Sequence, residues 1–120
     1  MTDRELLEDA AKAAGLVVHA GHQQKRDACG AGDVGLWIST ESTCWNPLTD
    51  DGDALRLAVK LDIEIYQGDE DGPSIYAGYW GKPERRDVTR MFCIELLDPD
   101  PYAATRRAIV RAAAAIGAAK

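Results

Sequence analysis

The sequence lacks any long apolar segment. None of its hydrophobic runs approaches the roughly 18 residues that a membrane-spanning helix needs. Residues 1–5 carry neither the basic start nor the apolar stretch of a signal peptide, and we find no lipidation signal. We therefore expect a cytoplasmic protein with no membrane partner.

Cysteine is scarce and its spacing is uninformative. Cys29, Cys44 and Cys93 are odd in number and far apart, which favours reduced thiols over a disulfide framework. There is no Cys-x-x-Cys pair, and His19 and His22 lack the i, i+4 spacing of a helical zinc site. A cysteine nucleophile would need a histidine placed beside it by the fold. The sequence therefore predicts no metal site and no Cys/His enzyme.

Other chemical signatures are missing as well. The sequence has no glycine-rich phosphate loop of either standard pattern and no Gly-x-Ser-x-Gly elbow. Its 14 Lys and Arg are outnumbered by 20 Asp and Glu, for a formal charge of −6. Non-specific nucleic-acid binding needs a basic face, so we expect no direct contact with nucleic acid. These absences favour a protein that is not an enzyme and uses no cofactor.

What is present is enough for one domain. The 120 residues are 46% hydrophobic, which excludes a disordered tail and allows a single domain over residues 1–120 with its own core. Periodicity predicts three helices: one that ends at Gly15, one from about residue 51 to 61, and one that follows Asp100-Pro101. The expected strands are 16–20, 34–39, 62–67, 75–80 and 88–97, with a long loop over 21–33.

This order is αββαβββα. Adjacent hairpins imply a mostly antiparallel sheet of about five strands, and the helices must cover one or both of its faces. The sequence therefore predicts an α+β protein arranged as an α-β-α sandwich. Thr49 or Asp50 is expected to cap the second helix. In the last helix the residues expected to point inward are Tyr102, Ile109, Ala113 and Ile116.

Aromatic residues gather in the strand expected at 75–80. Alternation places Tyr76 and Trp80 on one face and Ile75, Ala77 and Tyr79 on the other. If that second face were exposed, it would be a contact patch that supplies binding hot spots. Because three helices are available to cover it, we favour a core. An exposed aromatic strand would favour a homodimer.

Acidic residues concentrate in the middle of the chain. Between Glu41 and Asp71 nine acids accompany two bases, so this window carries −7 and the remainder +1. Such a layout can orient the encounter with a partner, although a solvated surface needs charge as well. Acids at a helix start also satisfy free N–H groups, and acids at a turn could bind a hard cation. The candidate contact residues are Asp50, Asp51, Asp53, Asp69, Glu70, Asp71 and Trp80.

Two stretches carry a family resemblance. The first is Trp45-Asn46-Pro47-Leu48-Thr49-Asp50 with Ala54-Leu55-Arg56-Leu57-Ala58 after it, and the second is the Ala- and Arg-rich segment 100–113. Together they resemble the phage ABA sandwich domain, a family of small bacteriophage and prophage proteins. In that family a Trp/Tyr-x-Pro-x-Thr-Asp motif opens the second helix and a helix rich in Ala and Arg closes the chain. The resemblance implies an α-β-α sandwich and a phage or prophage origin but no activity, and residues 68–90 do not contribute to it.

Two functional hypotheses follow. The first is a non-enzymatic phage or prophage accessory protein that binds a host or phage protein. In a special case it is an inhibitor of a host defence complex, with the acids of residues 41–71 in place of nucleic-acid phosphates. The alternative is a small-molecule, nucleotide-like binding protein in which Trp45, Trp80 and arginines line a pocket at a sheet edge or dimer seam.

Overall fold

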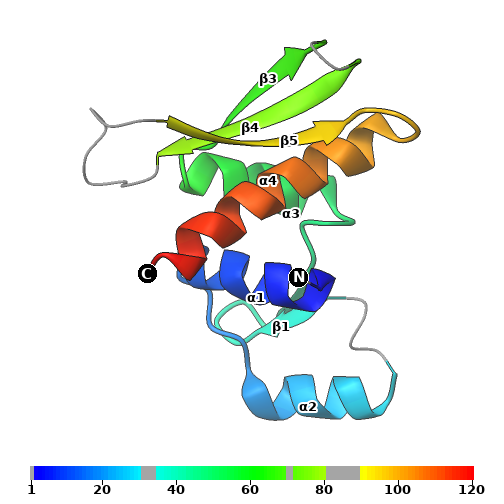
Figure 1. Cartoon of the computed structure of the whole chain (residues 1–120). Helices are drawn as coiled ribbons and strands as arrows, with labels where there is room; N and C mark the ends of the chain where they lie inside the picture. The colour runs from blue at the N-terminus through cyan, green and yellow to red at the C-terminus, as the bar shows by residue number, and fades with distance from the viewer. Residues whose placement is uncertain (1, 31–34, 70–71, 81–89) are drawn as a thin grey trace.

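The computed structural model describes residues 2–30, 35–69, 72–80 and 90–120 (Figure 1). Within these ranges the chain forms four helices and five strands. In chain order they are α1 (Asp3–Ala14), α2 (Ala20–Ala28), β1 (Leu36–Ile38), β2 (Thr43–Trp45), α3 (Asp51–Lys60), β3 (Glu64–Gly68), β4 (Ser74–Trp80), β5 (Arg90–Leu96) and α4 (Pro101–Ala118). The predicted α+β class is confirmed.

The strands form two antiparallel sheets. β1 pairs with β2, and a second sheet has the order β3-β4-β5. After β2 the chain passes through the Asn46-Pro47 turn and α3, and Figure 1 shows β1 and the β3-β4-β5 sheet on opposite sides of α1 and α4. The antiparallel pairing is as predicted. The single five-stranded sheet, the count of three helices and the order αββαβββα need correction, and the α-β-α layering is not confirmed.

α4 is the central element of the core. It packs against α1 on one side and against β4 and β5 on the other, and α3 also contacts it (Figure 1). Its buried residues are mostly small: Ala104, Ala108, Ala112, Ala113, Ala114 and Gly117 accompany Ile109, Val110 and Ile116. Small side chains let helix backbones approach closely. At Gly117 an added Cβ would lie 1.9 Å from the carbonyl oxygen of Asp9 in α1.

The ends of three helices follow the signals in the sequence. Gly15 has a φ of 71° and ends α1 in the left-handed conformation that glycine adopts without strain. Asp50 caps α3, since its Oδ2 accepts from Asp53 N–H at 2.8 Å. Asp100 caps α4 and is followed by Pro101 at the first helical position, as predicted.

The prediction for residues 16–30 is wrong. A strand was expected over 16–20, but there only Val18 bridges to β1. The loop expected over 21–33 contains α2, and residues 31–33 lie outside the described part of the chain.

α2 is stabilised by two side chains, His19 and Gln23, that are not among the usual sequence signals for a helix. His19 Nδ1 accepts from His22 N–H at 3.0 Å and so caps the helix. Gln23 is buried and its Oε1 accepts from Trp37 N–H of β1 at 2.7 Å. This second bond is a tertiary contact to β1, which the sequence of the segment alone does not indicate.

One expected core residue is also placed differently. Tyr102 in α4 is 72% exposed, whereas Ile109 is buried as predicted. Tyr102 lies in the first turn, where it borders an open groove between α3 and α4 together with Leu55 and Ile65.

The contact between α1 and α4 gives a first prediction. Gly117→Ala places a methyl group against Asp9 O, so we expect it to lower the free energy of unfolding by about 1–3 kcal/mol despite the better helix propensity of alanine. Urea denaturation measures this. Gly21→Ala is the control, because its Cβ would meet no atom closer than 3.7 Å. Equal stability of the two variants would contradict the close packing described.

Candidate functional site

The three-stranded sheet has one covered face. Ile75 and Ala77 of β4 are 3% and 0% exposed and belong to the core, and Tyr79 and Cys93 pack against it. This is the face toward α4. The prediction that Ile75, Ala77 and Tyr79 form core is therefore confirmed.

The opposite face of this sheet, here called the outer face, is apolar and open. Its residues are Tyr66 from β3, Tyr76 and Trp80 from β4, and Phe92, Ile94 and Leu96 from β5. Phe92, Ile94 and Leu96 are about half exposed, at 48%, 48% and 58%. Figure 1 shows no described element over this side of the sheet. Contiguous exposed apolar residues on a soluble protein mark interaction sites.

Three aromatic rings form the centre of the outer face. The Phe92 ring centroid lies 6.1 Å from that of Tyr66 and 6.3 Å from that of Tyr76, with planes inclined by 63° and 73°. This is the edge-to-face geometry that aromatic pairs favour. Two glycines make room for the rings, since a Cβ would lie 2.7 Å from Tyr76 at Gly68 and 3.0 Å from Phe92 at Gly78.

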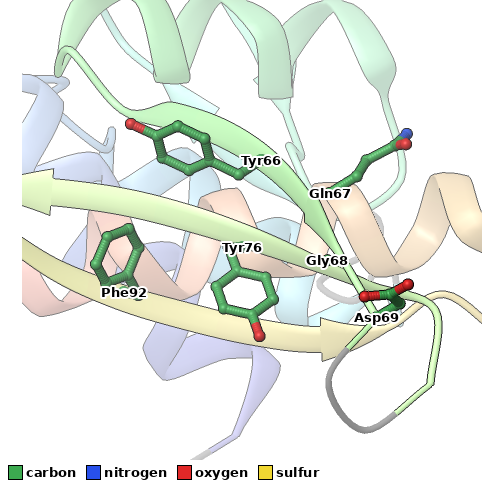
Figure 2. Close-up of a pocket in the computed structure, with 6 residues that line it drawn as sticks. All are labelled: Tyr66, Gln67, Gly68, Asp69, Tyr76 and Phe92. Carbon is green, nitrogen blue, oxygen red and sulfur yellow. The ribbon is translucent and has the colours of Figure 1, made fainter.

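A pocket opens beside these rings at one end of the outer face. It has a volume of about 360 Å³, within the range of small-ligand sites. Its lining residues are Tyr66, Gln67, Gly68, Asp69, Tyr76 and Phe92 (Figure 2). Among these described residues Asp69 carries the single formal charge. The pocket therefore combines aromatic walls with one carboxylate.

An arginine crosses the other end of the outer face. The Arg90 guanidinium lies 3.0 Å from Gly78 O and 3.1 Å from the Glu64 carboxylate, and its Cζ is 4.6 Å from the Trp80 ring centroid. Glu64 also accepts a hydrogen bond from the Tyr66 hydroxyl, which raises the pKa of Tyr66. The charge of Arg90 is thus paired within the sheet, and the same carboxylate orients the Tyr66 ring.

The acids at the start of α3 hold local structure. Asp50 caps the helix, and Asp53 accepts from Asn46 N–H at 3.0 Å and pairs with Arg56 at 2.8 Å. Asp51 pairs with Arg106 of α4 at 2.7 Å. Each of these three candidate contact residues therefore already has a partner within the chain.

The other candidate residues lie elsewhere. Trp80 is on the outer face with Tyr76, as alternation predicted. Asp69 follows β3 and borders the pocket, whereas Glu70 and Asp71 lie outside the described residues. The structure thus brings Asp69 to the aromatic rings and leaves the acids at the α3 start outside this pocket.

The soft metal ligands lie in different elements. His19 and His22 lie at the start of α2, with ring centroids 6.2 Å apart, and Cys44 lies in β2 beside Arg26. Cys93 is on the inner face of β5, where burial raises the pKa of its thiol. In the described part of the chain no group of three or more His, Cys, Asp or Glu is placed to hold a metal ion.

A second, smaller pocket lies next to the β2–α3 segment. It measures about 180 Å³ and its lining includes Trp45, Arg56, Glu41 and Lys60. The pocket contains Trp45 and an arginine, as the small-molecule hypothesis predicts, but it does not include Trp80. Arg56 is paired with Asp53, and the volume is below the usual range for ligand sites.

Tyr66, Tyr76 and Phe92 are not among the candidate contact residues predicted from the sequence. Alternation along the strand puts Phe92, Ile94 and Leu96 on one face, but it does not indicate which face of the sheet the helices cover. A usable signal was the pair Gly68 and Gly78, which lie on the same face as the rings and leave space above the backbone.

Comparison of this chain with protein-family models, curated proteins and solved structures gives no match. Membership in the phage ABA sandwich family therefore stays a prediction from the two sequence motifs. None of the described helices is long and apolar enough to cross a membrane.

The pairing of the α3 acids gives a second prediction. Asp53→Ala removes the acceptor of Asn46 N–H and the partner of Arg56 from a side chain that is only 16% exposed. We expect a loss of about 1–3 kcal/mol in the free energy of unfolding. Asp51→Ala removes an ion pair whose carboxylate is 77% exposed, so its cost should be below about 1 kcal/mol. Chemical denaturation compares the two, and an Asp53→Ala variant as stable as the parent would contradict this structural role.

Proposed function

We propose that this chain is a non-enzymatic binding module that docks a partner protein on the outer face of its β3-β4-β5 sheet. The observation that carries the proposal is the open cluster of Tyr66, Tyr76 and Phe92, flanked by Ile94 and Leu96. Large aromatic side chains supply much of the affinity at protein interfaces when a partner covers them.

The outer face is preorganised for such a role. Its strands are paired in register along their length, and their inner face is packed on α4. The Tyr66 ring is held by Glu64, and Gly68 and Gly78 let the Tyr76 and Phe92 rings lie close to the backbone. Groups that are already ordered lose less entropy on binding, so more of the contact energy appears as affinity.

The charge of the chain favours a basic partner. The net charge is −6, and the −7 window between Glu41 and Asp71 includes all of β3 and Asp69. Opposite charge on a partner would speed the encounter and orient it. The resemblance of the two sequence motifs to the phage ABA sandwich domain suggests the rest of the proposal. The protein would be a phage or prophage accessory protein, and its partner a host or phage protein.

Support for phosphate mimicry is weaker. Asp50, Asp51 and Asp53 would be its natural centre, but they cap a helix or pair with Arg56 and Arg106. We therefore assign docking to the outer face rather than to the α3 acids. For the small-molecule alternative, the pocket that holds Trp45 and an arginine measures about 180 Å³, below the usual size of a ligand site.

Site-specific photo-crosslinking tests the docking surface. A benzophenone amino acid replaces Phe92, which is 48% exposed, in one variant. In a control it replaces Tyr102 of α4, which is 72% exposed and lies away from the outer face. We expect the probe at position 92 to crosslink one protein from a bacterial lysate, and the probe at position 102 to crosslink none. Equal labelling from both positions, no labelling from position 92, or labelling only of a second copy of this chain would overturn the proposal.

A binding measurement with the captured partner completes the test. Phe92→Ser should weaken binding by about 2 kcal/mol or more if the ring is a hot spot. Its unfolding midpoint should stay close to that of the parent, because the side chain is 48% exposed. Leu55→Ser, at an apolar position of α3 that is 61% exposed, is the matched control and should bind as the parent does.

A further inference from the structure

We infer that the 360 Å³ pocket of the outer face accepts a cationic side chain, the ammonium of lysine or the guanidinium of arginine, from the docked protein. The inference rests on the proposed function and names the chemistry that the pocket would recognise. It starts from the composition of the pocket wall, which has three aromatic rings and one carboxylate.

Aromatic rings attract cations through the negative potential of their faces. A cation is stabilised electrostatically when it lies within about 6 Å of a ring centroid. Several rings around one site each contribute to this attraction. Here Phe92 is inclined by 63° to Tyr66 and by 73° to Tyr76, so the rings are not parallel and form walls of different orientation. Figure 2 shows the three rings along the strands, with Asp69 at the end of β3.

The charges around the pocket select for a cation. Asp69 is exposed at its border, and no lysine or arginine is among the described lining residues. Arg90, the cation on the described outer face, is paired with Glu64 and stacked on Trp80. It therefore does not neutralise Asp69, and an anionic ligand would meet a carboxylate without a compensating base.

The shape of lysine and arginine side chains also suits the pocket. Both have an apolar stem that packs on hydrophobic surface while the charged head reaches a polar group. On the outer face the stem would lie against Tyr76 and Phe92, and the head would reach Asp69. A purely apolar side chain would contact the rings but would gain nothing from the carboxylate.

Short peptides that differ in one side chain test this inference directly. The probes are acetylated and amidated Ser-Gly-Xaa-Gly-Ser peptides in which Xaa is lysine, arginine or the uncharged norleucine. Aromatic ¹³C–¹H spectra of the full chain follow the rings of Tyr66, Tyr76 and Phe92 during titration. We expect the lysine and arginine peptides to shift these resonances, with the norleucine peptide binding on the order of fivefold more weakly.

Two variants and two controls identify the groups involved. Tyr76→Leu and Asp69→Asn should each weaken binding of the cationic peptides by about twofold to fivefold. Tyr102→Leu and Glu8→Gln make the same chemical changes on α4 and α1, outside this pocket, and should leave the affinity unchanged. Added salt should weaken the binding of the lysine peptide and leave the binding of the norleucine peptide unchanged.

The inference fails if norleucine binds as well as lysine, if the rings do not respond to any peptide, or if either pocket variant binds as the parent does. Any of these results together with a crosslink from position 92 would overturn the cation site while protein docking on the outer face stands. The same results without that crosslink would overturn both.

Discussion

The close contact between α1 and α4 determines where the other elements can lie. At Gly117 the backbone of α4 approaches Asp9 so closely that a Cβ would overlap the carbonyl oxygen. α1 therefore packs on the far side of α4 from the β3-β4-β5 sheet, and in Figure 1 α1 and α4 lie between this sheet and β1. Because α1 lies behind α4 and α3 lies beside it, the described helices cover only one face of the β3-β4-β5 sheet. The open outer face is a consequence of this packing.

The chemistry of the outer face follows from small residues as well as large ones. Gly68 and Gly78 have no side chain to occupy the surface, so Tyr76 and Phe92 lie close to the strands. At one end Arg90 is paired within the sheet, and at the other Asp69 borders the pocket. The face is therefore apolar in its centre and acidic at the end that holds the pocket. This combination connects the fold to the proposed docking of a basic protein.

Local signals predicted much of the fold, and long-range contacts account for what was missed. Gly15, Asp50 and the Asp100-Pro101 pair act within one turn of a helix, so the residues themselves indicate where α1, α3 and α4 begin or end. α2 was missed because a histidine caps it and Gln23 stabilises it through β1. Alternation similarly grouped Tyr76 with Trp80, but which face is open depends on where α4 packs. For the same reason the site was predicted only in part, with Asp69 and Trp80 named and Phe92 left out.

Solvent accessibility of individual side chains tests the central claim most directly. A neutral gadolinium chelate broadens NMR resonances according to their exposure to solvent. The structure predicts strong broadening at Phe92 and Ile94 and protection at Ile75 and Ala77, independent of protein concentration. Protection of Phe92 and Ile94 at every concentration would show that another part of the chain covers the outer face. Protection that grows with concentration would show that a second copy covers it, and either result would contradict an outer face that is free to dock another protein.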